Sequence, residues 1–241
     1  MRHDPLTPLP RALLIDLDGT IIDSLASAEE VWQDLCAAAA PTIGVAGGQL
    51  YSAIKATADW FWADPGRGRA GRADLRASSR EIVQRALVQL GVSRDGLAAT
   101  IADSYRDRRD RFMLLPGALE ALDTLHSRQI ALGLLTNGAG PIQREKIDRF
   151  GLARFFDCIL IEGELGFGKP DERIYKHAMA ALGAAPPETW IVGDDLEWEV
   201  AAPQRLGIHA VWVDSAGRGL PVGAVVQPDR VVGSLAELVG A

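Results

Sequence analysis

Residues 12–20 read Ala-Leu-Leu-Ile-Asp-Leu-Asp-Gly-Thr, so an apolar run leads directly into an acidic turn that contains glycine. A short apolar run bounded by turn residues is typical of a strand that is buried on both faces of a sheet. The pattern recurs at four later places, residues 130–135, 158–161, 190–192 and 210–213. We therefore expect several short buried strands, each ending in a polar turn.

Segments with helical spacing lie between these runs, at residues 117–128, 141–150, 171–182 and 196–206. Strands that alternate with helices indicate an α/β fold, here a Rossmann-like three-layer core with a mainly parallel sheet. In such sheets ligands bind beyond the carboxyl ends of the strands. The polar turns are therefore expected to meet at one edge and to form the functional site.

The stretch after the first strand follows a different pattern. Four helical segments, residues 26–40, 48–62, 75–90 and 97–112, are separated by clusters of glycine and proline, and no strand pattern interrupts them. We interpret this stretch as an all-helical domain inserted between the first and second core strands. The predicted domains are an α/β core of residues 1–22 and 115–241 and a helical insertion of residues 23–114.

Composition places the chain among ordinary globular proteins, since 48% of its 241 residues are hydrophobic and 24% are charged. No apolar run approaches the ~18 residues of a membrane helix, and the first run is too short for a signal-peptide core. The net charge of −7 argues against nonspecific nucleic-acid binding, which needs a basic surface. Cys36 and Cys158 lie too far apart to suggest a disulfide framework or a structural zinc site. We expect a cytoplasmic protein with no membrane and no nucleic-acid partner.

The acidic turn after the first strand places Asp16 and Asp18 two residues apart. One carboxylate of such a pair can act as a nucleophile and the other as a general acid and base, if their surroundings separate their pKa values. Gly19 allows the backbone to approach a bound anion closely. This turn is therefore the predicted catalytic centre.

The later turns carry residues that suit a phosphate and a metal ion. Thr136 offers a hydroxyl and Asn137, the one Asn of the chain, an amide, and both groups can bind phosphoryl oxygens. Lys169, one of four lysines against 21 arginines, could hold a nucleophile and a phosphate together. Asp194 and Asp195 follow another strand, and hard carboxylate oxygens suit Mg²⁺.

Taken together, these turns resemble the motifs of the haloacid dehalogenase superfamily of phosphotransferases. Residues 16–20 match its DxDGT-like first motif, Thr136 its second, Lys169 its third, and Asp194 with a later acid its fourth. The helical insertion resembles the α-helical cap of the first subclass of this superfamily.

The resemblance implies a role for each matching residue. Asp16 would attack phosphorus to form an aspartyl-phosphate, and Asp18 would protonate the leaving oxygen and then activate water. Mg²⁺ would be held by Asp16, by the backbone carbonyl of Asp18 and by Asp194. Thr136 and Lys169 would orient and neutralise the phosphoryl group, beside Gly19 and Asn137. The predicted function is a magnesium-dependent phosphatase for a small phosphorylated metabolite, acting as a monomer or homodimer.

The fourth motif departs from the family pattern. Many relatives carry an Asn-Asp pair where this chain has Trp198 and Glu199, so Glu reaches one methylene further than the expected Asp. Either Asp195 or Glu199 could serve as the second acid near the metal, and we favour Glu199. Glu197 could be a solvated helix residue.

Several alternatives share parts of the pattern. Dehalogenases of the superfamily lack the acid two residues after the nucleophile, so Asp18 favours a phosphatase. A phosphomutase shares both aspartates and the cap, and a non-catalytic phosphate-binding module would share the fold. Phosphonate hydrolysis would need a cap lysine, for which Lys55 is the one candidate. Residues 163–169 fit the start of a P-loop, but Pro170 stands where that motif needs Ser or Thr.

The insertion contains an aromatic and arginine-rich stretch with two interpretations. Residues 60–62 read Trp-Phe-Trp, and six arginines follow up to Arg85. The stretch could be core aromatics beside a solvated helix face, or a surface that recognises an anionic or aromatic substrate.

Overall fold

The computed structural model describes residues 10–240, so residues 1–9 and 241 of the predicted core lie outside the described residues. The described chain forms two compact units. One unit is Ser24–Met113, and the other combines the chain up to Asp23 with the chain from Leu114 onward.

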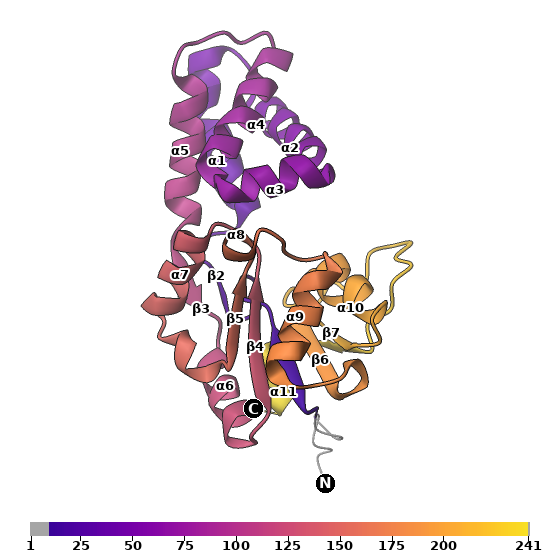
Figure 1. Ribbon diagram of the computed structural model, residues 1–241. Helices are drawn as coiled ribbons and strands as arrows, with labels where there is room; N and C mark the ends of the chain where they lie inside the picture. Colours follow the sequence, from indigo (N-terminus) through magenta and orange to yellow (C-terminus); the bar gives the residue numbers. More distant parts are fainter. Residues whose placement is uncertain (1–9, 241) are drawn as a thin grey trace. The chain divides into compact units, whose positions relative to one another are not determined.

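The larger unit is built on a six-stranded sheet with the order β5-β4-β1-β6-β7-β8 (Figure 1). Every neighbouring pair of strands is parallel. The strands are β1 (Ala12–Ile15), β4 (Ala131–Thr136), β5 (Cys158–Ile161), β6 (Thr189–Gly193), β7 (His209–Val213) and β8 (Arg230–Val232). The five predicted strands are all present, and β8 is a sixth that the sequence pattern did not predict.

Helices cover both faces of this sheet (Figure 1). They are α6 (Ala118–Ser127), α7 (Gly140–Arg149), α8 (Glu162–Leu165), α9 (Glu172–Leu182), α10 (Ala202–Gln204) and α11 (Leu235–Val239), with the 3-10 turns η1 (Leu152–Phe155) and η2 (Pro186–Glu188) and the π-helix η3 (Leu196–Ala201). The predicted α/β class with a parallel sheet is therefore confirmed.

The central position of β1 determines where the site lies. All four residues of β1 are buried, and Ile15 is in register with Leu134 of β4 and Val192 of β6. The chain adds β4 and β5 on one side of β1 and then β6, β7 and β8 on the other side. Ligands of such sheets bind at the strand ends where the order reverses. The residues that follow β1, β4 and β6 therefore share the functional edge.

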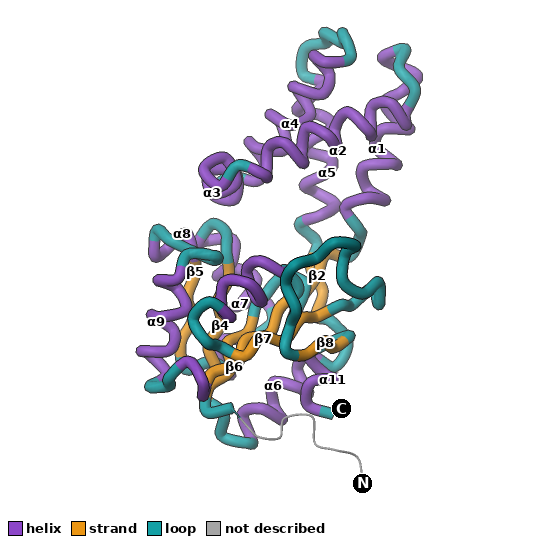
Figure 2. Tube along the Cα trace, turned by 90° about the vertical axis from the view of Figure 1, so that its right-hand side faces the viewer, coloured by secondary structure: helices purple, strands orange, loops and turns teal. Residues whose placement is uncertain are grey.

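The smaller unit is all-helical, as predicted for the insertion (Figure 2). Its helices are α1 (Ala28–Ile43), α2 (Gly47–Ala63), α3 (Pro65–Ala73), α4 (Leu75–Gln89) and α5 (Leu97–Arg109). Buried residues such as Leu50, Ile54 and Val83 form its own apolar core. Two short strands, β2 (Ile22–Ser24) and β3 (Phe112–Leu114), form a two-stranded sheet where the chain enters and leaves the insertion.

Helix α3 was not predicted, because its sequence contains three glycines and a proline. The carboxylate of Asp64 accepts from the N–H of Arg67 at 2.7 Å and caps the helix, and Pro65 occupies the first turn, where its missing N–H costs nothing. A Cβ at Gly71 would lie 2.7 Å from a ring carbon of Phe61. Glycine is therefore required here by close packing against an aromatic ring, not by a break in the helix.

Among residues 10–240, no helix is both long enough and apolar enough to cross a membrane.

Candidate active site

The ammonium group of Lys169 lies at the centre of a buried charged cluster. It donates to Asp16 Oδ1 at 2.5 Å and to Glu199 Oε1 at 2.6 Å. The side chains of Lys169 and Glu199 are 1% exposed and that of Asp16 is 9% exposed. Asp16 follows β1 directly and is fixed by its backbone N–H, which donates to the carbonyl of Val192 at 3.0 Å. Because these charged groups have so little access to water, the loss of one partner would leave an uncompensated buried charge.

This cluster contains more acidic than basic groups, because Asp194 joins Asp16 and Glu199 beside Lys169. Burial raises the pKa of Asp16, and it raises the pKa of Asp194 to about 7, with the nearby charge of Asp16 adding to the effect. Burial likewise raises the pKa of Glu199 to about 8. Burial alone would lower the pKa of Lys169, but Asp16 and Glu199 outweigh it and the pKa is raised. Three carboxylates thus surround one ammonium.

Asp194 packs against the turn that follows Asp16. Gly19 has a φ of +88°, and a Cβ at this position would lie 2.6 Å from the carboxyl carbon of Asp194. Glycine is therefore required both for the backbone conformation and for the close approach of the carboxylate. The predicted acid of the fourth motif thus lies beside the first motif.

The donor set fits Mg²⁺. Within the described part of the chain, no group of three or more His, Cys, Asp or Glu side chains is arranged to hold a metal ion. Mg²⁺ does not need such a cage, because it is commonly bound by one or two carboxylates together with waters and substrate phosphate. Asp16 and Asp194 supply two hard carboxylates, and a divalent cation beside them would stabilise their ionised forms.

The two candidates for the second acid of the fourth motif both have protein partners. The carboxylate of Asp195 accepts from the N–H groups of Glu197 and Trp198, each at 2.9 Å, and so caps the π-helix. Glu199 accepts from Lys169 and, through Oε2, from the N–H of Asp195 at 3.0 Å. Glu199 rather than Asp195 therefore joins the charged cluster.

Gly193 and the π-helix bring Glu199 to this position. A Cβ at Gly193 would lie 2.6 Å from the carboxyl carbon of Glu199. The π-helix is anchored from the other side by Tyr175, whose buried hydroxyl donates to the carbonyl of Trp198 at 2.5 Å. A π-helix adds a residue to the turn and often occurs at functional sites. Here the π-helix carries Glu199, whose side chain packs against Gly193 at the end of β6.

Asp18 contacts two side chains of α7 that were not predicted from the sequence. The ammonium of Lys146 donates to both of its carboxylate oxygens, at 2.7 and 3.0 Å, and the amide of Gln143 donates to one at 2.8 Å. The same amide nitrogen donates to the hydroxyl of Thr136. Gln143 and Lys146 are buried, whereas the side chain of Asp18 is 40% exposed.

A signal for these two residues was present in the sequence. Lys146 is one of four lysines in a chain that otherwise uses arginine. Gln143 and Lys146 lie three residues apart, so a helix places them on one face. That face is buried together with Ile147. Apolar periodicity did not indicate this buried face, because such periodicity detects only faces made of apolar residues and Gln143 and Lys146 are polar.

The Asn137 side chain contacts the loop that carries Lys169. Its amide donates to the carbonyl of Lys169 at 2.7 Å and accepts from the N–H of the same residue at 2.8 Å. The side chain therefore joins the turn after β4 to the loop that carries Lys169. Glu162 makes a parallel connection, since its carboxylate accepts from the N–H of Gly138 at 3.1 Å. These contacts allow Asn137 to position Lys169, and its contact with phosphate stays a prediction.

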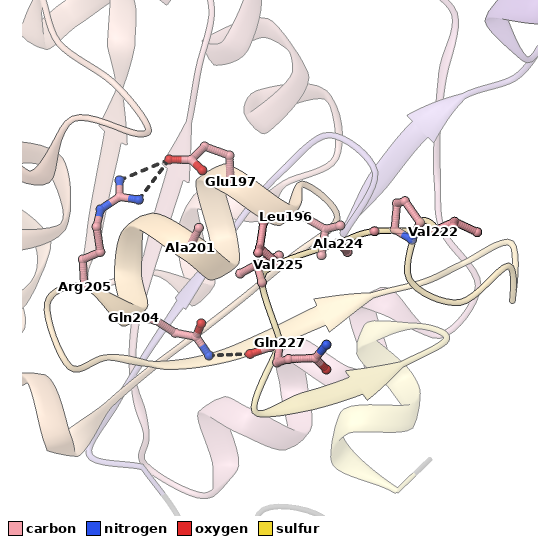
Figure 3. Close-up of a pocket in the computed structure, with 12 residues that line it drawn as sticks. Leu196, Glu197, Ala201, Gln204, Arg205, Val222, Ala224, Val225 and Gln227 are labelled. Carbon is pink, nitrogen blue, oxygen red and sulfur yellow. Dashed lines mark hydrogen bonds and ion pairs between the residues drawn. The ribbon is translucent and has the colours of Figure 1, made fainter.

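The pocket drawn in Figure 3 contains none of the predicted catalytic or metal-binding residues. Glu197 lies at its edge and pairs with Arg205 at 3.1 Å, which agrees with its interpretation as a solvated helix residue. The pocket is lined by residues of η3 and α10, by Arg205 and by the loop between β7 and β8, namely Leu196, Glu197, Ala201, Gln204, Arg205 and residues 221–227.

Several arginines of the helical unit have acidic partners in that unit. Arg80 pairs with Asp103 at 2.7 Å, and Arg76 pairs with Asp107 at 2.8 Å. Arg67 and Arg85 lie over the ring of Trp60, their guanidinium carbons 3.9 and 4.2 Å from its centre. These contacts support the interpretation of a solvated, self-paired helix face.

Lys55, the residue required by phosphonate chemistry, is an exposed partner of Asp59 at 3.0 Å. An exposed ion pair gives the ammonium no apolar pocket that would lower its pKa, so the nucleophilic amine of a Schiff base is not favoured.

Comparison with known proteins agrees with this geometry. A family model described as a haloacid dehalogenase-like hydrolase matches residues 10–207, a range that contains all the predicted site residues. A phosphoserine phosphatase from Thermus thermophilus is 34% identical over 251 aligned residues, which cover 95% of this chain and 97% of that protein.

Solved structures share the fold. The magnesium-bound HAD-hydrolase YfnB from Bacillus subtilis is 23% identical, with a TM-score of 0.67, and covers 95% of this chain and 96% of that chain. An L-2-haloacid dehalogenase from Xanthobacter autotrophicus is 21% identical, with a TM-score of 0.62, and covers 95% of this chain and 97% of that chain. At these identities the fold is common to proteins named for different reactions, so the site residues must distinguish between them.

Proposed function

Because the chain belongs to the family of haloacid dehalogenase-like hydrolases, we propose that it hydrolyses small phosphomonoesters through a phosphoryl intermediate on Asp16. The observation that carries this proposal is the buried contact between Asp16 and Lys169, with a second carboxylate on Asp18 two residues further along. A dehalogenase needs no proton donor for a departing halide, so Asp18 supports a reaction that expels an alkoxide.

In the first step an ionised oxygen of Asp16 attacks phosphorus, and the bond from phosphorus to the leaving oxygen breaks. Protonated Asp18 gives its proton to that oxygen. In the second step water attacks the phosphorus of the aspartyl-phosphate, and Asp18, now ionised, takes a proton from the water. The bond between phosphorus and Asp16 breaks, and inorganic phosphate leaves.

The remaining residues supply charge and orientation. Lys169 donates one hydrogen bond to Asp16 and offers positive charge to the transferring phosphoryl group. The Thr136 hydroxyl donates to a phosphoryl oxygen. Mg²⁺, held by the carboxylates of Asp16 and Asp194 and by the backbone carbonyl of Asp18, would supply further positive charge to the phosphoryl oxygens. Phosphoryl transfer depends mainly on such positioning and charge stabilisation.

For the substrate we propose a small phosphorylated metabolite, with O-phosphoserine as the first compound to test. The support is the similarity to a phosphoserine phosphatase, which extends over 95% of this chain. A cytoplasmic location and a monomeric or homodimeric state remain predictions from the sequence.

The test is release of inorganic phosphate from O-phosphoserine, sugar phosphates, nucleoside monophosphates and 4-nitrophenyl phosphate, with Mg²⁺ and with EDTA. We expect turnover with Mg²⁺ that EDTA abolishes, and none in Asp16→Asn. Conversion of a sugar phosphate to its isomer without phosphate release would indicate a phosphomutase instead. Phosphate binding with no turnover of any compound would indicate a non-catalytic module.

A further inference from the structure

The contacts of Asp18 extend to the predicted phosphate-binding hydroxyl. From this geometry we infer that Lys146 and Gln143 are positioning residues, which hold the Asp18 carboxylate ready to take a proton from water and couple it to Thr136. The inference rests on the proposed function, because Asp18 matters here as the acid and base of that reaction. It assigns a role to two residues outside the four sequence motifs.

Lys146 fixes the position of the Asp18 carboxylate. Its ammonium donates to both carboxylate oxygens, at 2.7 and 3.0 Å. Charge-assisted bonds of this kind are short and strong, so two of them hold the carboxylate in one orientation. The side chain of Lys146 is 9% exposed, so solvent competes little on its side of the pair. A carboxylate held in one orientation is placed to receive the proton of the water that attacks the intermediate in the second step.

Gln143 connects this carboxylate to the phosphate-binding hydroxyl. Its amide nitrogen carries two hydrogens, one of which is donated to Asp18 at 2.8 Å and the other to the hydroxyl of Thr136. A hydroxyl has one hydrogen and can accept up to two further bonds. Because Thr136 accepts from Gln143, its own hydrogen is left to point toward a phosphoryl oxygen. A single amide thereby orients both groups.

This arrangement predicts which step suffers when a contact is removed. With a good leaving group such as 4-nitrophenolate, the first step needs no proton from Asp18, whereas the second step always needs a base. Loss of Lys146 should therefore slow breakdown of the aspartyl-phosphate more than its formation. Loss of Gln143 should also weaken the binding of the phosphoryl group, because Thr136 loses its orientation.

The experiment is stopped-flow hydrolysis of 4-nitrophenyl phosphate by wild type, Lys146→Met, Lys146→Arg and Gln143→Met. For Lys146→Met we expect kcat to fall about a hundredfold, the lower end of what acid–base catalysis contributes. KM should be unchanged or lower, with a burst of nitrophenolate near one per enzyme. Lys146→Arg keeps two donors for the carboxylate and should recover most of the lost kcat. Gln143→Met should lower kcat and raise KM.

Lys176→Met is the matched control, because Lys176 also lies on a helix of the larger unit but forms an exposed ion pair with Glu172. It should retain wild-type kinetics. A Lys146→Met protein with wild-type kcat, or one with a lower kcat, a higher KM and no burst, would overturn the inference. So would a Lys146→Arg protein no more active than Lys146→Met.

Failure of the proposed function is recognised separately, by the absence of turnover and of a trapped aspartyl-phosphate in the wild type. In that case, crystal structures of wild type and Lys146→Met decide the positioning claim. We expect the Asp18 carboxylate to leave the position it occupies beside Gln143 when Lys146 is replaced. An unchanged Asp18 position would overturn the claim whatever the reaction is.

Discussion

The molecule contains two ion-pair networks with similar bond lengths and very different surroundings. In the larger unit, Lys169 contacts Asp16 and Glu199 at 2.5 and 2.6 Å, and each of the three side chains is at most 9% exposed. In the helical unit, Arg80 contacts Asp103 at 2.7 Å, and these side chains are 48% and 32% exposed. Bond length alone would rank the two networks as equals.

Access to water makes the difference between them. The two groups of an exposed pair are also well solvated when they are apart, so the pair adds little to stability. A buried pair has already lost its hydration, so removal of one partner leaves an uncompensated charge. The buried network also contains more carboxylates than ammonium groups, which is a poor arrangement for stability and a suitable one for binding a cation and a phosphoryl group. The composition of the buried network therefore fits the proposed phosphoryl transfer better than a role in stability.

The largest effect is expected from Lys169→Met, which removes the cation from the buried network. Turnover should fall about a thousandfold, since one preorganised charge or donor contributes roughly that much to a transition state. The free energy of unfolding should fall by about 3 kcal/mol, because Asp16 and Glu199 would then repel each other without a partner. Steady-state kinetics and urea unfolding measure the two effects. Equal losses in Lys176→Met would contradict the special place given to Lys169.

A smaller loss is expected from Glu199→Gln. Glutamine keeps one oxygen that can accept from Lys169, but its NH2 group replaces the oxygen that accepts from the N–H of Asp195, and one of the three carboxylates in the cluster is removed. Turnover should fall about tenfold to a hundredfold, comparable to the loss of a supporting group beside a metal ion. The Tm of the metal-free protein should change little, because removal of one acidic group from the cluster offsets the lost bond to the N–H of Asp195. A marked drop in that Tm would mean that the cluster needs the negative charge for folding.

The pH dependence of stability should distinguish the networks further. Burial raises the pKa of Asp194 to about 7 and that of Glu199 to about 8, whereas both groups ionise near pH 4 in an unfolded chain. Between about pH 4 and pH 8 the folded, metal-free protein therefore holds more protons than the unfolded chain, and its stability falls as the pH rises.

Mg²⁺ should replace those protons, so it should raise the Tm more at pH 8 than at pH 5. Thermal unfolding followed by circular dichroism, with EDTA and with Mg²⁺, checks both statements. The Asp194→Asn variant should lose the response to Mg²⁺. A Tm that climbs steadily from pH 5 to pH 8 in EDTA would rule out this account of the cluster.

The smallest effect is expected from Arg80→Ala in the helical unit. The pair with Asp103 is exposed, so the Tm should fall by less than about 2 °C and turnover of 4-nitrophenyl phosphate should not change. High salt should reduce even this difference, because exposed charges are screened. A large fall in Tm or activity would remove the contrast between the two networks.

The sequence was sufficient to predict the parallel sheet and to place the candidate catalytic groups at its strand ends. Asp16, Thr136 and Asp194 follow buried apolar runs, and parallel strands bring their carboxyl ends to one edge whatever lies between them. The supporting contacts of Gln143 and Lys146 could not be predicted in the same way, because they depend on which side chain each helix face meets. Helix α3 was missed for a related reason, since a glycine such as Gly71 is required there by close packing against aromatic rings, which the sequence does not reveal.

The placement of β1 in the middle of the sheet has a consequence for the order in which the chain can assemble. Ala12 is in register with Ala131 on one side and with Thr189 on the other. At 5–20 residues per second, a ribosome needs on the order of ten seconds to deliver the second partner after the first strand has emerged. The helical unit is one continuous segment that lies between β1 and β4, so its mostly local contacts can form during that interval. Asp16, which follows β1 and is the proposed nucleophile, is thus among the last residues to find its neighbours. Until then the apolar β1 segment of the nascent chain is exposed to aggregation.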